Sequence, residues 1–172
     1  DKSDDLEGES DWLCGEDIGK TVKYLRNLRD PTQAKFPQPK LYKGKYWANP
    51  NQESKQYDFG GVHINSGVSN HCFYLLSTAI GIEAALPIFY NCLLKLGDLS
   101  DFIDFRNVLI ECANEHKEQT LACLNEVGLG TTAVSDWLRS PRINRLPSRH
   151  VPIPTTPRPV PPNPVPTTPR PV

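Results

Sequence analysis

Asp58–Val68, which reads DFGGVHINSGV, is the stretch that decides the fold of this chain. Two glycines stand before His63, and a short polar turn then leads directly into an apolar helical pattern. Glycine has no Cβ, so the backbone can approach another surface closely at this point. If the turn folds back, Asp58 can orient the imidazole of His63, a pairing of carboxylate and ring that recurs in hydrolytic sites. The plain alternative is a partly buried histidine with one backbone partner.

The longer string is informative because it resembles the signature of the thermolysin family of zinc metallopeptidases. Residues 70–76 are similar to the helix that follows in that family. Further stretches resemble family segments in the same order: residues 11–17 (Asp-Trp-x-x-Gly-Glu), residues 25–31 (Leu-Arg-Ser-Met-x-x-Pro), and residues 88–90 and 101–106, which resemble its later helices. The resemblance extends from about Asp11 to Gly128 and implies the family's C-terminal half, which is mainly helical and forms one wall of the active-site cleft.

The zinc-binding residues of this family lie, by resemblance, in the other half, on a helix with the motif His-Glu-x-x-His. The histidines of this chain are His63, His71, His116 and His150, and no two are four residues apart. A helical zinc pair needs that spacing to place both rings on one face. We therefore expect no zinc ligands in this chain, and we expect an N-terminal half to be the partner that binds the zinc.

The resemblance also assigns roles to four residues. It implies that His63 donates a hydrogen bond to the tetrahedral oxyanion and that Asp58 holds its imidazole. It implies that Arg26 binds the substrate carbonyl beyond the scissile bond, and that Leu25 lines the pocket for the next side chain. Without the resemblance, Arg26 is an ordinary surface arginine. Phe59 stands where the family often has asparagine, which affects none of these roles.

Residues 1–18 form an acidic lead-in, and the first seventeen residues hold eight acidic side chains. Such a run is commonly a solvated segment. The alternative is a calcium site, because carboxylate oxygens suit a hard cation. The resemblance indicates Asp11 and Glu16 as calcium ligands, with a further ligand in the absent half. Leu13 and Ile18 depart from the family pattern, which argues against a full set of calcium sites.

Residues 19–58 carry scattered prolines without a lasting period and predict a long irregular segment on the substrate side. Residues 59–138 predict the helical domain, a bundle of amphipathic helices. Four apolar stripes at helical spacing predict its core: Val68, Cys72, Leu75, Leu76 and Ala79; Ile82, Ala85, Leu86, Phe89, Cys92, Leu93 and Leu96; Phe102, Phe105, Leu109, Cys112 and Ala113; and Leu121, Leu124 and Val127.

Three residues are expected to shape the helix ends. Pro87 is expected in or near the first turn of its helix, where amides lack internal partners. Ser100 is expected to cap the third helix, with Asp101 placed favourably near its dipole. Gly128 is expected to end the fourth helix as its C′ residue.

Residues 139–172 are basic and then rich in proline and threonine, and a seven-residue string beginning at Pro154 recurs at Pro166. Proline fixes φ and removes amide donors, so this low-complexity tail is expected to be a disordered, extended spacer. Thr-Pro repeats are typical of O-glycosylated stalks on secreted proteins. An alternative is that residues 158–164 bind an adaptor domain that recognises proline-rich peptides.

Composition excludes some functions. The net charge of −1 argues against a dedicated nucleic-acid binder, and no apolar run approaches the length of a membrane span. The five cysteines form no Cys-x-x-Cys pair, which leaves packed thiols and disulfides as equal alternatives. Methionine is absent even at position 1, so we expect a processed form, a designed sequence or a fragment of a longer protein, and a fragment agrees best with the missing zinc half.

The leading hypothesis is the C-terminal half of a secreted, thermolysin-like zinc metalloendopeptidase that cleaves proteins or peptides and is inactive alone. One alternative is a non-catalytic binding module derived from that fold. The other is an interaction protein that acts through its proline-rich tail. Survival of Asp58, His63 and Arg26 together favours the enzyme.

Overall fold

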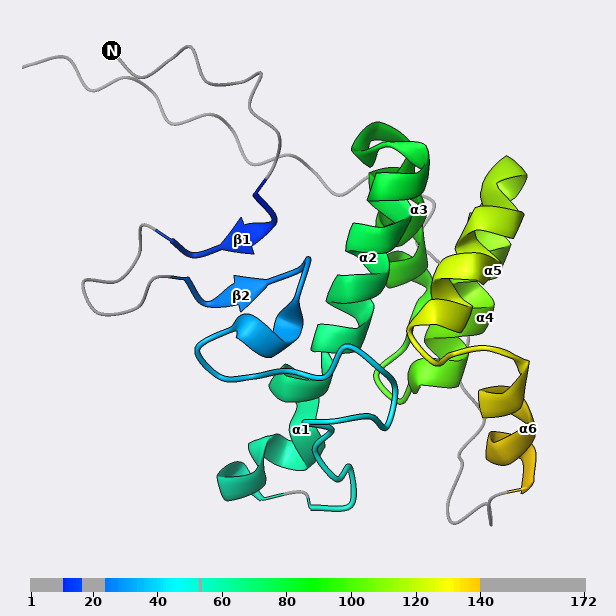
Figure 1. Ribbon diagram of the computed structural model, residues 1–172. Coiled ribbons are helices and arrows are strands. Elements are labelled where there is room, and N and C mark those ends of the chain that lie inside the picture. Colours follow the sequence, from blue (N-terminus) through cyan, green and yellow to red (C-terminus); the bar gives the residue numbers. More distant parts are fainter. Residues whose placement is uncertain (1–10, 17–23, 53, 140–172) are drawn as a thin grey trace, which may run out of the picture.

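Figure 1 shows the computed structural model, which describes residues 11–16, 24–52 and 54–139. The described part is mainly helical, as predicted. The helices α2 (Gly67–Ile80), α3 (Ile82–Lys95), α4 (Phe102–Cys112) and α5 (Lys117–Glu126) pack side by side, with α2 in contact with α3 and α5. The proline-rich tail and the first ten residues lie outside the described residues.

Short elements line the N-terminal half of α2. The strands β1 (Leu13–Cys14) and β2 (Arg26–Asn27) pair antiparallel, and 3₁₀ turns follow at Pro31–Gln33 and Lys55–Tyr57. The kinked helix α1 (Asp58–Asn65) then leads into α2. Otherwise the described part of the segment from Tyr24 to Ser54 is irregular, and it passes around α1 and the start of α2 (Figure 1). A further 3₁₀ turn, Asn114–His116, joins α4 to α5.

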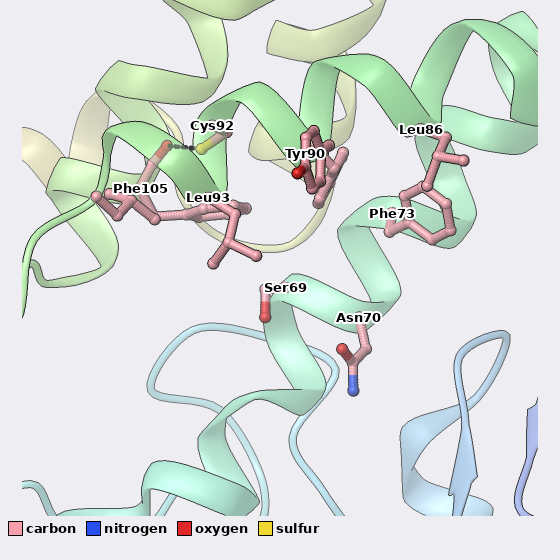
Figure 2. A pocket seen from close by; sticks show the side chains of 10 residues that line it. Ser69, Asn70, Phe73, Leu86, Tyr90, Cys92, Leu93 and Phe105 are labelled. Carbon is pink, nitrogen blue, oxygen red and sulfur yellow. Dashed lines mark hydrogen bonds between the residues drawn. The ribbon is translucent and has the colours of Figure 1, made fainter. Parts of the chain in front are cut away.

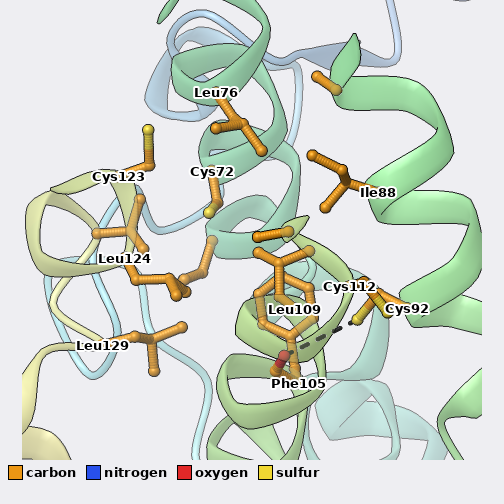
Figure 3. Packing of buried hydrophobic residues seen from close by; sticks show 14 of the residues in the cluster. Cys72, Leu76, Ile88, Cys92, Phe105, Leu109, Cys112, Cys123, Leu124 and Leu129 are labelled. Carbon is orange, nitrogen blue, oxygen red and sulfur yellow. Dashed lines mark hydrogen bonds between the residues drawn. The ribbon is translucent and has the colours of Figure 1, made fainter. Parts of the chain in front are cut away.

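The core lies between α2, α3, α4 and α5 (Figure 3). Burial of a large apolar side chain stabilises a fold by about 1.5–3 kcal/mol, so this cluster is the main source of stability. The side chains that are completely or almost completely buried include Val68, Cys72, Leu76, Ala85, Ile88, Cys92, Ile103, Leu109, Leu124, Val127 and Leu129.

The predicted core face of α3 is partly wrong. Ile82, Leu86 and Leu93 are 45%, 55% and 67% exposed, whereas Ile88, which the stripe omitted, is 4% exposed. Helix α3 is apolar around most of its circumference, so spacing alone does not select the face that packs inward. Ala79, near the end of α2, was also predicted to lie in the core and is exposed. The buried stripe of α3 is the one that faces α2 and α4.

The helix caps differ from the prediction at one end of α4. Asp101, not Ser100, is the N-cap: its carboxylate accepts the amides of Ile103 and Asp104, while the Asp104 side chain accepts the amide of Asp101. A carboxylate caps well because it also meets the positive end of the helix dipole. Ser100 instead accepts the amide of Gly97.

The end of α5 agrees with the prediction that Gly128 terminates it. Gly128 adopts φ +78°, and its amide donates to Asn125 O at 3.0 Å. The amide of Leu129 donates to Leu124 O at 2.7 Å. This pair of hydrogen bonds satisfies carbonyls at the helix end that would otherwise lack partners.

Pro87 lies inside α3, not in its first turn. Gly81 is the N-cap, so Pro87 occupies the sixth helical position and removes one hydrogen bond to the preceding turn. Its side chain is exposed, and water can solvate the freed carbonyl. The expected position was wrong because the helix begins immediately after α2, with only Gly81 between them.

Helix α6 (Thr131–Arg139) belongs to none of the four predicted apolar stripes; it begins three residues after Gly128 and extends one residue beyond the expected domain boundary at 138. It contacts α4, and Ala133 and Val134 pack against the core. Within the described residues, no helix combines the length and the apolar character needed to cross a bilayer.

All five cysteines are free in the structure; Cys14 is exposed, and the other four are buried. Burial raises the pKa of the Cys92 thiol to about 12, and burial likewise raises the pKa of Cys72 and Cys123. Cys92 Sγ donates to the carbonyl of Phe105 at 3.8 Å (Figure 3). These side chains therefore act as small apolar groups in the core.

His71 joins α2 to the segment after β2. Its side chain is buried, its Nδ1–H donates to Leu28 O at 3.1 Å, and its ring stacks on Tyr74. Burial lowers the pKa of His71 below its ordinary 6.5, and the hydrogen bond to Leu28 offsets only part of this effect.

We expect the free energy of unfolding to decrease as the pH falls from about 8 to about 5.5, because the unfolded chain protonates His71 more readily than the folded chain. The stabilisation that comes from a neutral His71 is complete above pH 6.5, the pKa of an ordinary histidine. It is lost as the pH falls toward the lower pKa that His71 has in the folded chain. Urea unfolding across this range measures the slope. His71→Asn keeps a donor for Leu28 O and should flatten this slope. An equal slope in His71→Asn and the unsubstituted protein would contradict the assignment.

Candidate active site

The backbone turn that carries the predicted site is built from four consecutive left-handed residues. Asp58, Phe59, Gly60 and Gly61 have φ values of 55°, 48°, 82° and 81°. A Cβ on Gly60 would lie 2.7 Å from Pro50 O, and a Cβ on Gly61 would collide with the side chain of Ala48. Only glycine fits both positions, because a side chain would be strained by φ and blocked by the neighbouring segment.

The turn brings the carboxylate of Asp58 back onto His63. Asp58 Oδ1 lies 2.6 Å from His63 Nδ1, while Oδ2 accepts the amides of His63 and Ile64 at 2.8 and 2.9 Å. The imidazole therefore has a fixed orientation although its side chain is 71% exposed. Among the described residues, no hydrogen bond or ion pair involves its Nε2, which can therefore meet an external partner.

The Asp58 carboxyl is tuned by these contacts. Burial raises its pKa, but the hydrogen bonds from the His63 ring and from the amides of Ile64 and His63 outweigh this effect. The net pKa of Asp58 lies below its ordinary 3.8, so the group is a carboxylate at neutral pH. A carboxylate accepts all three donors at once, which a neutral side chain does not do.

Gln38 supports the turn from the irregular segment. The side chain is 2% exposed, and its Nε2 donates to His63 O at 2.5 Å and to Ser66 Oγ at 3.4 Å. Ser66 Oγ also donates to His63 O at 2.7 Å. Sequence reasoning did not find Gln38, because it lies 25 residues before His63 and no local pattern marks it.

Asn65 makes a second connection to the same segment. Its Oδ1 accepts the amide of Ala48 at 2.9 Å, and its Nδ2 donates to Ala48 O at 2.9 Å. The amide of Gly60 donates to Gln52 O at 2.8 Å. The segment from Gln38 to Gln52 is thus hydrogen-bonded to the histidine turn at three places.

Arg26 and Leu25 lie on or next to β2. Arg26 is half-buried, and its Nη1 donates to Leu25 O at 3.0 Å. In the described part of the chain no carboxylate pairs with its guanidinium, which leaves donors for a substrate carbonyl. Leu25 is 40% exposed and lies over Gly15. Strand β2 is tied to α2 through His71 and Leu28, but no direct contact joins Arg26 to His63 in the described structure.

The predicted calcium ligands do not form a site by themselves. Asp11 Oδ1 accepts the amide of Leu13 at 3.0 Å, and Glu16 is exposed. Across residues 11–16, 24–52 and 54–139, no three His, Cys, Asp or Glu side chains are grouped so that they could hold a metal ion. The residues described here therefore do not fit a zinc or calcium ion without ligands from elsewhere.

An apolar groove of about 400 Å³ lies between α2, α3 and the start of α4 (Figure 2). Phe73, Leu86, Tyr90 and Leu93 line it, with Ser69 and Asn70 of α2 at one side, and none of the predicted site residues belongs to it. It has apolar walls and few polar groups, so it contributes no acid, base or anion-binding group to chemistry at His63.

Comparisons with known proteins identify the family. Residues 2–129 match the family model described as "Thermolysin metallopeptidase, alpha-helical domain". Bacillolysin of Bacillus amyloliquefaciens is 40% identical over 106 residues, which cover 61% of this chain and 19% of that protein. A zinc metalloproteinase of Renibacterium salmoninarum is 34% identical over 93 residues, which cover 46% of this chain and 16% of that protein.

Among solved structures, the precursor of protealysin, a metalloproteinase from Serratia proteamaculans, matches with a TM-score of 0.54 and 29% identity. The match covers 71% of this chain and 42% of that one. The matched part of the chain thus spans less than half of the solved structure and less than a fifth of each of the two curated relatives named above. On the family match over 128 of its 172 residues, 2–129, the chain belongs to the thermolysin metallopeptidase family, in its alpha-helical domain.

Proposed function

We propose that this chain supplies the anion-stabilising histidine and the substrate-binding arginine of a secreted thermolysin-like metalloendopeptidase. The observation that carries the proposal is the fixed, exposed imidazole of His63. Asp58 orients the ring through Nδ1 at 2.6 Å, and the side chain remains 71% exposed. A ring that is costly to order yet open to solvent is suited to an external ligand rather than to packing.

Hydrolysis of a peptide bond develops negative charge on the carbonyl oxygen. An imidazolium donates from both nitrogens, so His63 can hold Asp58 with Nδ1–H and donate Nε2–H to that oxygen. A donor already held in place needs no reorganisation when the charge appears, which makes its stabilisation effective. Asp58 acts as the positioning residue in this scheme.

Arg26 would bind the substrate backbone beyond the bond that is cleaved, and Leu25 would contact the side chain that follows. The free donors of Arg26 and the exposed side chain of Leu25 support these roles. The metal of this family supplies the activated water, and by resemblance a preceding half of the protein holds it. This chain's own residues therefore orient the substrate and stabilise charge.

The role of Arg26 is tested in the complete enzyme, assembled with its metal-binding half. Arg26→Gln removes a charged donor to the substrate, and we expect kcat/KM to fall about 10- to 100-fold, mainly through KM. Steady-state cleavage of a fluorogenic peptide measures both constants. Arg29→Gln, an exposed arginine three residues away, is the control and should leave kcat/KM within about twofold. An unchanged KM in Arg26→Gln would remove Arg26 from substrate binding.

A further inference from the structure

The segment 31–52 is unusual in its charge. It holds four lysines and no acidic residue or arginine, although the whole chain has twenty acidic residues and a net charge of −1. Lys40 lies 4.0 Å from Asp30. Lys35, Lys43 and Lys45 are exposed, and no carboxylate of the described residues lies within 4.0 Å of them.

These three ammonium groups lie instead over aromatic rings. Lys43 Nζ is 5.0 Å from the ring centroid of Tyr42, Lys45 Nζ is 4.8 Å from that of Tyr46, and Lys35 Nζ is 5.5 Å from that of Phe36. A ring beneath an ammonium restrains the cation weakly without neutralising its charge. The positive charges therefore remain open to an external anion.

The backbone that carries Lys43 and Lys45 is firmly held. The amide of Tyr42 donates to Val127 O at 2.9 Å, and the turn is closed by Gly44 N to Leu41 O at 2.9 Å. The rings of Tyr42 and Trp47 pack on Phe102 of α4, with centroids 5.6 and 5.3 Å away. The backbone around Lys43 and Lys45 therefore loses little further conformational freedom when a ligand binds, which favours affinity.

The same segment contacts the histidine turn of the proposed site. Gln38 donates to His63 O, Ala48 exchanges two hydrogen bonds with Asn65, and Gln52 O accepts the amide of Gly60. In Figure 1 it passes around α1 and the base of α2. The segment thus borders the histidine turn, and every charged side chain along its 22 residues is positive.

We infer that segment 31–52 is an electrostatic docking surface for acidic polypeptides. Opposite charge steers an approaching chain and holds its carboxylates within the roughly 8 Å over which charge acts at physiological salt. Lysine ammonium groups are point charges suited to single carboxylates, whereas nucleic-acid surfaces commonly use the planar fork of arginine, which this segment lacks. The consequence for substrates, a preference for peptides with flanking Asp or Glu, rests on the proposed function.

The test is direct binding to the 172-residue chain, without hydrolysis. Fluorescence anisotropy with a labelled oligo-glutamate peptide of about 12 residues should show binding that weakens about tenfold between about 50 and about 200 mM NaCl. Lys43→Gln with Lys45→Gln should raise Kd about fivefold or more, since two charge contacts are lost. The control, Lys95→Gln with Lys117→Gln, removes the same charge elsewhere and should change Kd less than about twofold.

Four results would overturn the inference: no binding of the oligo-glutamate peptide, equal binding of an oligo-glutamine peptide, an equal loss in the two double variants, or tighter binding of a single-stranded DNA of equal charge. Circular dichroism of both variants confirms that they are folded. The assay needs no metal and no turnover, so its failure leaves the role of His63 untouched. Conversely, the binding result does not depend on whether His63 has the proposed catalytic role.

Discussion

Replacing His63 by alanine in the complete enzyme is expected to lower kcat by about 10²–10³-fold, the usual effect of removing one donor to an oxyanion. In the proposed role, this donor would act on charge that appears only in the transition state, so kcat and kcat/KM should fall by the same factor. The measurement is steady-state hydrolysis of a fluorogenic peptide at saturating and at low substrate.

Because the His63 ring is exposed, its removal should change activity with little effect on folding. His63→Ala removes one hydrogen bond to Asp58, and the two amides on the other oxygen remain. Stability should therefore decrease by only about 1 kcal/mol. Val62→Ala, an exposed neighbour in the same turn, is the control and should retain nearly full activity. A folded His63→Ala enzyme with unchanged kcat would exclude His63 from the mechanism.

Asp58→Asn should lower kcat about 10- to 100-fold and the free energy of unfolding by about 1–3 kcal/mol, because one amide oxygen replaces a carboxylate that accepts three donors. The asparagine NH₂ would face a backbone N–H, and the imidazole would lose its fixed orientation. Asp98→Asn, at an exposed position between α3 and α4, is the control and should change neither quantity.

The stability difference should also depend on pH. The folded pKa of Asp58 lies below its ordinary 3.8, so its stabilisation is present above that pH and is lost as the pH falls through the folded value. The difference in free energy of unfolding between Asp58→Asn and the unsubstituted protein, measured by urea unfolding, should therefore narrow below about pH 4.

A kcat of Asp58→Asn within about twofold of the original would show that His63 needs no orienting carboxylate.

Much of the fold was predictable because local rules act over short distances. Apolar spacing located α2 to α5, and Gly128 marked the end of α5, since a C′ residue in the left-handed region favours glycine. The family string also predicted that Asp58 could reach His63, because a five-residue separation is closed by one turn.

The errors have physical causes that sequence spacing does not contain. Helix α3 is apolar on several sides, so its exposed Leu86 and Leu93 resembled core residues. Ser100 and Asp101 both suit an N-cap, and the partner Asp104 selected the second. Gln38 could not be found because its role depends on contacts with His63 and Ser66 that only the folded chain creates.

The histidine turn depends on neighbours that precede it by many residues. Fixing the backbone of Asp58 to Gly61 in the left-handed region costs conformational entropy, and contacts within the turn do not offset this cost. The turn is held by Ala48, Pro50 and Gln52, which enclose it. Assembly should therefore proceed from the helical core outward, with the histidine turn completed last. A newly synthesised chain would therefore lack an oriented His63 imidazole until the segment from Ala48 to Gln52 has packed against the turn.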